Sequence, residues 1–120
     1  MQFALDVLDL VDTFPRTIAG EVVGRQLAKC ATSAAANYRA TCNARSRAEF
    51  IAKLGVVVEE SDESEFWLDV SGRKKMSEPR ETERLRIEAG ECRVIFGKSL
   101  GTARANIKLT QISKSPKITR

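Results

Sequence analysis

The side chains best suited to chemistry form a run of carboxylates in the second half of a long predicted helix. Asp62, Glu65 and Asp69 are spaced three and four residues apart, so they lie along one helix face. Glu59 and Glu63 share another face. Such carboxylates could bind a hard cation or act as an acid and a base. One helix face offers too few converging oxygens, so we expect structural ion pairs, with no metal and no cofactor; a carboxylate enzyme remains a third hypothesis.

The expected partners of these carboxylates are arginines on the preceding helix. We expect either Glu63 or Glu65 to form an ion pair with one of these arginines. The candidate partners are Arg25, Arg39 and Arg45. Such a pair would fix the register of two helices or a seam between subunits.

The chain contains no histidine. Its absence excludes Ser-His-Asp and Cys-His catalysis, as well as the Glu-x-x-His di-iron site of ferritin-like bundles. The sequence also lacks a glycine-rich phosphate loop of the Walker type. We therefore expect a protein that is not an enzyme.

A second candidate surface is basic, and it could bind an anion or nucleic acid. Arg39, Arg45 and Arg47 cluster at the predicted turn between the second and third helices. The end of the chain carries more cations and no acid from residue 104 onward; the binding candidates there are Lys108, Lys114, Lys117 and Arg120. Together these charges would attract a phosphate backbone. The net charge is only +4, so an ordinary solvated surface is the alternative.

Two adjacent aromatic residues supply a third candidate feature. Phe66 and Trp67 must point to different faces of their helix, so one should be core and the other near the surface. We take Trp67 as the candidate interface aromatic, because exposed aromatic residues often anchor protein interfaces. Core packing of both rings is the alternative.

The three cysteines are scattered and form no CxxC pair, which favours a reducing, cytoplasmic setting. Cys30 and Cys92 fall in apolar helical stretches, so we expect both to be small core residues. The first residues resemble an amphipathic helix rather than a signal peptide. Nowhere do 18 apolar residues run together, so we expect no membrane-spanning helix.

Four segments with helical periodicity must position these residues. They cover about residues 2–14, 18–41, 46–72 and 81–105. Thr17 is a plausible N-cap of the second, and Ser46 with Glu49 forms a capping box at the start of the third. Short connections predict an all-α, antiparallel up-down-up-down four-helix bundle over residues 1–106. Residues 107–120 show no sustained period and are expected to form a basic, flexible tail.

The middle of the chain resembles one bacterial family. The similarity is strongest over residues 37–40, 44–54 and 59–68, and it continues at 88–91 and at Ile95-Phe96. These segments resemble the four-helix bundle proteins first noticed as reading frames within intervening sequences of large-subunit ribosomal RNA genes. The resemblance covers roughly residues 3–105. Cys92, where a leucine is common, and the flexible Gly97 and Gly101 depart from the family pattern.

This resemblance implies a four-helix bundle that assembles as a homopentameric ring or barrel. The family is similar to the accessory variability determinant of diversity-generating retroelements, which binds a reverse transcriptase and has affinity for nucleic acid. The leading hypothesis is therefore a non-enzymatic, self-assembling scaffold that binds a protein partner, such as a reverse transcriptase or another nucleic-acid enzyme. The alternative is sequence-independent nucleic-acid binding through the basic turn and tail.

Overall fold

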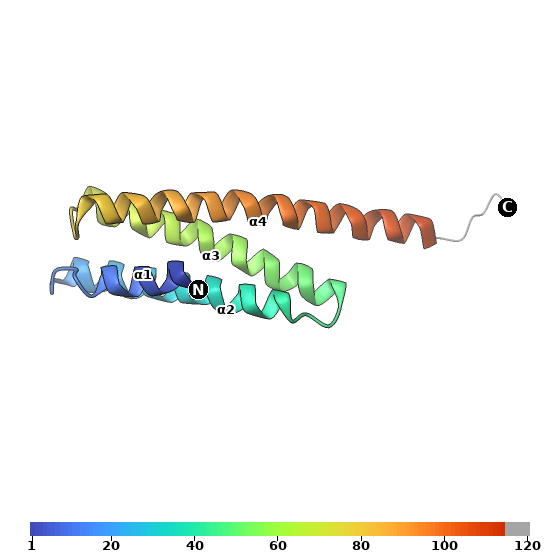
Figure 1. The fold of residues 1–120 in the computed structure, drawn as a ribbon, viewed down its shortest axis with the longest axis horizontal. Helices are drawn as coiled ribbons and strands as arrows, with labels where there is room; N and C mark the ends of the chain where they lie inside the picture. Colours follow the sequence, from blue (N-terminus) through green and yellow to red (C-terminus); the bar gives the residue numbers. More distant parts are fainter. Residues whose placement is uncertain (115–120) are drawn as a thin grey trace.

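The computed structural model describes the backbone of residues 1–114 and the side chains of residues 1–108. Within this part of the chain there are four helices and no strand. Their bounds are α1 Gln2–Val11, α2 Ile18–Cys42, α3 Arg47–Arg73 and α4 Pro79–Lys114. Successive helices run in opposite directions along a rod 68 Å long (Figure 1). The predicted all-α, antiparallel four-helix bundle is confirmed.

Side chains that cap the backbone set the starts of α2 and α3. The Thr17 hydroxyl accepts a hydrogen bond from the Gly20 amide at 3.0 Å, and the Ser46 hydroxyl accepts one from the Glu49 amide at 3.0 Å. Each bond satisfies an amide that the first turn of a helix leaves free. The second half of the predicted capping box differs, because the Glu49 carboxylate accepts from the Arg45 amide at 3.4 Å.

The C-terminus of α3 is closed by a Schellman motif. The Met76 amide donates to the Ser71 carbonyl at 3.0 Å, and the Lys75 amide donates to the Gly72 carbonyl at 3.1 Å. Lys75 has a φ of 53°, in the left-handed region that glycine usually occupies at this position. Met76 is buried and joins the core, so the motif also fixes the path of the chain into α4.

Two predicted helix ends were wrong. α1 ends at Val11, three residues before the predicted end, although Phe14 is still buried in the core. α4 continues to Lys114 instead of stopping near residue 105. Its last part contains no glycine after Gly101 and no proline, and its many good helix formers sustain the helix without an apolar face. Residues 107–114 are therefore helical, and the rest of the predicted tail, 115–120, lies outside the described residues.

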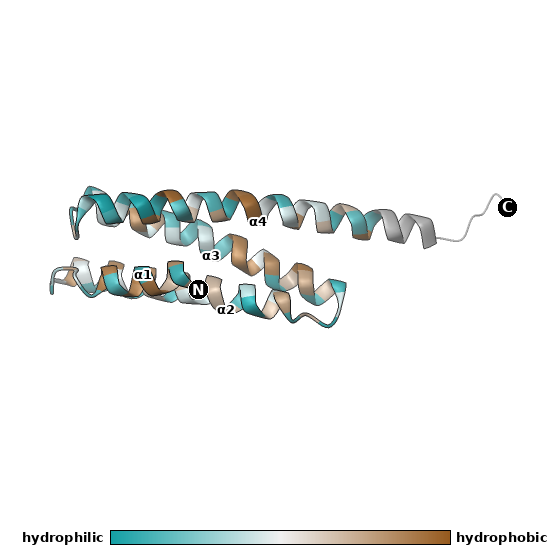
Figure 2. Cartoon of the chain, viewed as in Figure 1, coloured by the Kyte–Doolittle hydropathy of each residue, from teal (hydrophilic) through white to brown (hydrophobic). Residues whose placement is uncertain are grey.

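α3 is the central helix of the bundle and packs against both α2 and α4, while α1 packs against α2 and more lightly against α4. Hydrophobic residues are concentrated on α1 and the first half of α3 (Figure 2). The larger core cluster contains Val7, Leu27, Leu68 and Leu85, one from each helix, none of them exposed. A second cluster around Leu54, Val57 and Leu100 joins α3 to α4 further along the rod. Each of the fully buried leucines contributes roughly 2 kcal/mol of hydrophobic stabilisation.

Candidate functional site

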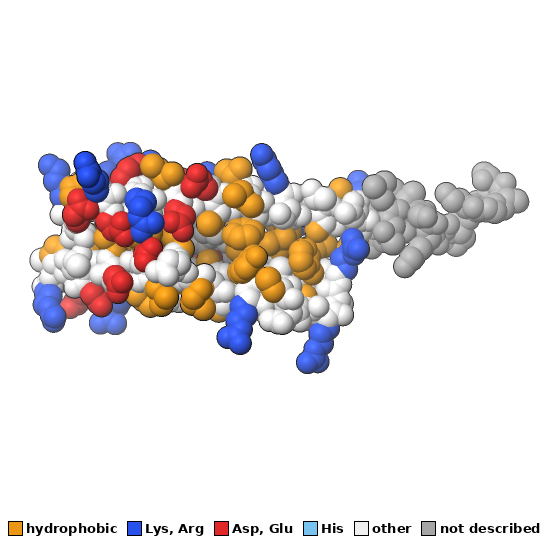
Figure 3. All heavy atoms as spheres, in the orientation of Figure 1, with side chains coloured by type: hydrophobic (Ala, Val, Ile, Leu, Met, Phe, Trp, Pro, Cys, Tyr) orange, Lys and Arg blue, Asp and Glu red, His pale blue; other side chains and the backbone are white. Residues whose placement is uncertain are grey.

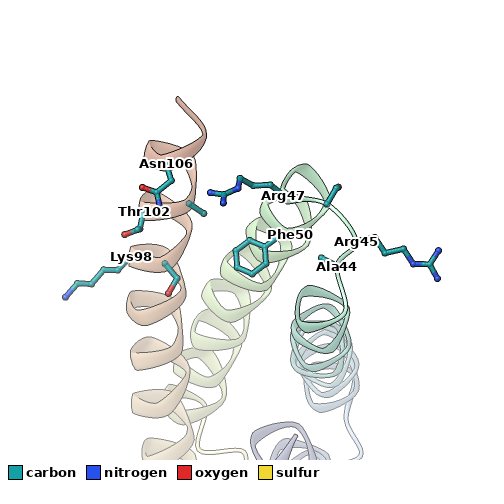
Figure 4. A pocket seen from close by; sticks show the side chains of 10 residues that line it. Ala44, Arg45, Arg47, Phe50, Lys98, Thr102 and Asn106 are labelled. Atoms are coloured by element: carbon teal, nitrogen blue, oxygen red, sulfur yellow. The ribbon is translucent and has the colours of Figure 1, made fainter. Parts of the chain in front are cut away.

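An open cavity of about 800 Å³ lies where the turn between α2 and α3 faces the side of α4. Its lining combines basic, hydroxyl and apolar groups: Ala44, Arg45, Ser46, Arg47, Phe50, Lys98, Ser99, Thr102, Ala103 and Asn106. In Figure 4 the Arg47 side chain extends from the start of α3 towards α4, whereas Arg45 points away from the cavity. We call this the distal cavity. Its hydroxyl, amide and guanidinium donors could bind an anionic group.

The predicted basic residues are only partly brought together. Arg45 and Arg47 both border the distal cavity, although only the Arg47 side chain extends across it, and Lys98 of α4, which the sequence analysis did not single out, borders it as well. Arg39 is exposed in the last turn of α2 and does not line the cavity. Lys108 is exposed on the extension of α4. The other tail candidates, Lys114, Lys117 and Arg120, have side chains outside the described residues.

Charge is strongly segregated along the rod. We call residues 32–58 and 94–114 the distal half, because they make up the part of the rod that contains the turn from α2 into α3 and the end of α4 beyond it (Figure 1). Its one acidic residue is Glu49, against eight basic residues: Arg39, Arg45, Arg47, Lys53, Lys98, Arg104, Lys108 and Lys114. The other fifteen acidic residues belong to the opposite, proximal half. On the visible face in Figure 3, acidic side chains accordingly appear only towards the proximal end.

The predicted ion pair exists for Glu65, but its partner was wrong. Glu65 accepts a hydrogen bond from Arg93 of α4 at 2.9 Å, and Asp62 lies 3.6 Å from the same guanidinium. Among the described residues, neither predicted carboxylate pairs with Arg25, Arg39 or Arg45, and no arginine of α2 forms an ion pair there. The Glu65 face of α3 is turned towards α4, so the pair sets the register between α3 and α4.

Glu63 has a different environment from Glu65. It is exposed and forms no ion pair with an arginine in the described part of the chain. A hydrogen bond with Glu60 raises the pKa of the Glu63 carboxyl, and burial adds to this effect. The positive charge of Lys29 on α2 lowers the pKa of the Glu63 carboxyl and so partly offsets this rise.

The sequence analysis missed a second cluster of ion pairs, centred on Arg84 of α4. Its guanidinium lies 2.7 Å from Glu81, 2.9 Å from Asp6 and 3.2 Å from Glu88. The bond to Asp6 joins α1 to α4 across 78 positions of sequence. The pairs of Arg84 with Glu81 and Glu88 could be predicted from spacings of three and four residues along one helix. The pair with Asp6 could not, because it depends on how α1 packs against α4.

The carboxylates of the acidic run are engaged in ion pairs with arginines. Among the residues that the structure describes, no group of three or more cysteine, aspartate or glutamate side chains could hold a metal ion. Asp62 and Glu65 face Arg93, and Asp69 is 3.1 Å from Arg73 one turn later. These carboxylates act as partners of arginines, which is the structural interpretation that the sequence favoured.

Of the two adjacent aromatic residues, Phe66 is the more exposed, whereas the sequence analysis took Trp67 as the candidate interface aromatic. Trp67 is half-buried and packs against the larger core cluster, whereas Phe66 is 56% exposed. Their ring centroids are 4.8 Å apart in an edge-to-face arrangement. One ring is therefore core and the other surface, as expected, but Phe66 is the exposed aromatic residue.

Burial raises the thiol pKa of two of the three cysteines, Cys30 and Cys92. Cys30 is buried as predicted, and its burial raises the pKa of the thiol although Ser64 donates a hydrogen bond to its sulfur at 3.3 Å. Cys92 is only half-buried, and burial raises its pKa as well. A raised pKa disfavours the reactive thiolate. Cys42 is the last residue of α2 and is exposed.

None of the helices described is both long enough and apolar enough to cross a membrane.

Comparison with known proteins decides the family. Residues 1–98 match the family model described as 23S rRNA-intervening sequence protein. The chain belongs to this family. The resemblance found in the sequence is thereby confirmed. No curated protein matches the chain.

A solved structure supports the same conclusion for the 23S rRNA-intervening sequence fold. The chain is similar to a protein of unknown function from the S23 ribosomal protein family of Bacteroides thetaiotaomicron, solved by crystallography. The two share 26% sequence identity with a TM-score of 0.74. The match covers 82% of this chain and 92% of that chain, so it includes most of the bundle.

Proposed function

We propose that this protein is a non-enzymatic scaffold that assembles with copies of itself and binds a protein partner. The observation that carries the proposal is an apolar stripe on α4 that none of the other described helices covers. Ile87, Val94 and Ile95 share one face of α4 and are 49%, 44% and 60% exposed. Phe66 on α3 is 56% exposed, and Ile18 at the start of α2 is 85% exposed. Large apolar side chains grouped on an open helix face are typical of protein interfaces.

The resemblance supports a homopentamer as the form of this assembly, and a nucleic-acid enzyme, such as a reverse transcriptase, as the partner. Light scattering behind a sizing column tests the first part. We expect a mass of about five times the 13.3 kDa chain. Ile95→Glu should lower this mass, because it places a charge in the apolar stripe. Ala52→Glu, at an exposed position of α3, is the matched control and should leave the mass unchanged. A wild-type mass of one chain at micromolar concentration would refute self-assembly.

A second candidate function is sequence-independent nucleic-acid binding through the distal half. The segregation of charge favours it, since the distal half contains eight basic residues and one acidic residue. One of the eight, Arg47, extends its guanidinium across the distal cavity (Figure 4). Phosphate contacts release counterions, so log K should fall by about 0.9 for each contact per tenfold rise in salt on duplex DNA.

Titration of labelled duplex and single strands at several salt concentrations tests this function. Arg45→Glu with Arg47→Glu should weaken binding to all sequences and reduce the salt slope. Arg73→Glu with Lys74→Glu, exposed at the proximal end, is the charge-matched control. Absence of binding at low salt would eliminate the function.

A further inference from the structure

Exposed apolar side chains lie on two different helices of the bundle. On α4, Ile87 and Val94 belong to its apolar stripe, and both are exposed. On α2, Val22 is 50% exposed and lies four residues after Ile18, so the two share a face of that helix. The apolar stripe on α4 therefore has a counterpart of the same kind on α2.

α2 and α4 stand at opposite corners of the bundle. Both pack against α3, but in the described part of the chain they make no close backbone approach to each other. Neither helix therefore covers the apolar face of the other within one copy. Between two copies this becomes possible, if α4 of one copy packs against α2 of the next. A contact between two different faces of the same protein is heterologous, and it adds one copy after another.

Hydrogen bonds to α3 show which residues of α2 and α4 lie at the same height along the rod. Ser64 of α3 donates a hydrogen bond to the sulfur of Cys30 on α2 at 3.3 Å. The next residue of α3, Glu65, accepts one from Arg93 of α4 at 2.9 Å and lies over Gly90. Cys30 of α2 therefore lies at about the height of these two residues of α4.

Opposite charges face outwards at this height. Lys29 of α2 and Glu91 of α4 are both exposed, and neither forms an ion pair among the residues that the structure describes. α2 and α4 run in the same direction (Figure 1), so distances along the two helices compare directly. Val22 precedes Lys29 by seven residues, which is about 10 Å. Ile87 precedes Glu91 by four residues, which is about 6 Å, so the two apolar residues also lie within one helical turn of the same height.

Both faces also lean towards α3. The charge of Lys29 attracts that of Glu63 on α3, and Val22 lies two turns from Lys29 on the same side of α2. On α4, Gly90 faces α3, and Ile87 lies three residues before it. Copies joined through these two faces therefore turn in the same direction at every contact.

We propose that the exposed face of α4 around Ile87 packs against the exposed face of α2 around Val22 in the next copy, with the two helices parallel. Glu91 then lies opposite Lys29, so opposite charges meet at the edge of an apolar contact. The matching heights need no shift along the rod, so successive copies are related by rotation alone and close into a ring instead of a filament. This inference rests on the proposed self-assembly and names the two surfaces that meet in it.

Two variants of the full chain, studied alone and mixed, test this arrangement. Ile87→Glu blocks the α4 face and Val22→Glu blocks the α2 face, because each places a charge in the apolar contact. We expect each variant alone to have the mass of one 13.3 kDa chain. A mixture contains one intact pair of faces, so it should form a complex of two chains and nothing larger. Titration of one labelled variant with the other should give at least about tenfold tighter binding than titration with unlabelled copies of itself.

The control variant is Leu5→Glu. Leu5 is 46% exposed, much like Val22, but it belongs to α1, which takes part in neither face. We expect this variant to keep the wild-type mass, and circular dichroism establishes that all three variants fold. A loss of mass as large as that of Val22→Glu would place the contact on α1 and overturn the inference.

Reversal of charge tests whether Glu91 meets Lys29. Glu91→Lys alone and Lys29→Glu alone each place like charges opposite each other, so each should raise the concentration needed for assembly by about two- to fivefold. The double variant restores opposite charges and should return this concentration to the wild-type value. A double variant that assembles no better than the single variants would overturn the pairing of the two faces.

Solution mass separates this inference from the scaffold proposal. A wild-type mass of one chain would refute self-assembly and, with it, this inference. A wild-type assembly that Val22→Glu leaves intact would overturn the inference alone, because it would show that the α4 face packs against itself in an isologous contact.

Discussion

The carboxylate of Glu65 lies directly over Gly90 of the neighbouring helix. A Cβ atom on Gly90 would stand 2.7 Å from Glu65 Oε2, which is closer than two such atoms can approach. The missing side chain at Gly90 thus creates the space in which Glu65 accepts its hydrogen bond from Arg93. Gly90 has a packing role that its unfavourable helix propensity conceals.

Substitution of the glycines of α4 should separate the packing role of Gly90 from the low helix propensity that it shares with every glycine. Gly97→Ala should raise the free energy of unfolding by about 0.5–1 kcal/mol, because nothing lies within 4 Å of the added Cβ. Gly90→Ala should raise the free energy of unfolding much less, because the added Cβ displaces the Glu65 carboxylate. The surface ion pair between Glu65 and Arg93, worth up to about 1 kcal/mol, is then lost. In a Glu65→Ala background Gly90→Ala should recover the full gain. Urea denaturation of the four proteins measures this coupling, and additive effects would contradict it.

Gly20 should be the glycine least tolerant of substitution. A Cβ atom there would lie 2.0 Å from the Pro15 carbonyl oxygen, which belongs to the backbone and cannot swing aside. We expect Gly20→Ala to destabilise the protein by at least about 1–3 kcal/mol. Gly55→Ala, where the added Cβ meets nothing within 4 Å, should be stabilising instead. Thermal unfolding of the two variants gives the comparison, and equal melting temperatures would show that the start of α2 moves freely.

Lys75 offers a stabilising substitution. Its φ of 53° costs a residue with a side chain about 1 kcal/mol, a strain that glycine does not have. Lys75→Gly should therefore raise the free energy of unfolding by up to that amount. Lys74→Gly, where φ is −84°, should give no gain. A lower stability of Lys75→Gly than of the wild type, measured by urea denaturation, would contradict the Schellman geometry.

The bond between Asp6 and Arg84 should make the docking of α1 sensitive to acid. Hydrogen bonds from Gln2 and then Arg84 hold the pKa of Asp6 below its ordinary value of 3.8. A lowered pKa means that Asp6 stabilises the fold above its unfolded pKa and that this contribution is lost as pH falls through the folded pKa. Asp6→Asn should lower Tm at pH 7 and flatten the decline of Tm below about pH 4. Asp9→Asn, an exposed position of α1, should keep the wild-type profile.

Glu63 should show the opposite dependence. Its hydrogen bond with Glu60 raises its pKa above the ordinary value of 4.5. The stability linked to its proton is present below the unfolded pKa and is lost as pH rises through the higher folded pKa. Glu63→Gln should therefore stabilise the protein at pH 7 by up to about 0.5 kcal/mol, and the difference should vanish on acidification below about pH 4. Destabilisation at pH 7 would show that Lys29 outweighs Glu60.

The starts of the helices were predictable because they depend on neighbouring residues. Thr17 and Ser46 accept hydrogen bonds from amides three residues ahead, a relationship that local sequence contains in full. The end of α4 was not predictable from periodicity. Its last turns extend beyond the α2–α3 turn, so no partner helix imposes an apolar stripe, and helix propensity alone sustains them.

The partners of the candidate site residues depend on how helices rotate against one another. Glu65 pairs with Arg93 and not with an arginine of α2, because the register between α3 and α4 turns that face of α3 towards α4. The exposure of Phe66 instead of Trp67 follows from the same rotation. Spacing within one helix identifies which side chains share a face but not which neighbour that face meets.

The segregation of charge gives the rod a permanent electric dipole along its long axis, with the positive pole at the distal end. Copies that pack side by side in the same direction bring like poles together and repel one another, whereas antiparallel neighbours attract. A parallel ring would gather every basic half at a single rim. Its formation should then be favoured by salt or by a polyanion, which neutralises that rim, so the subunits and a nucleic acid would assemble cooperatively.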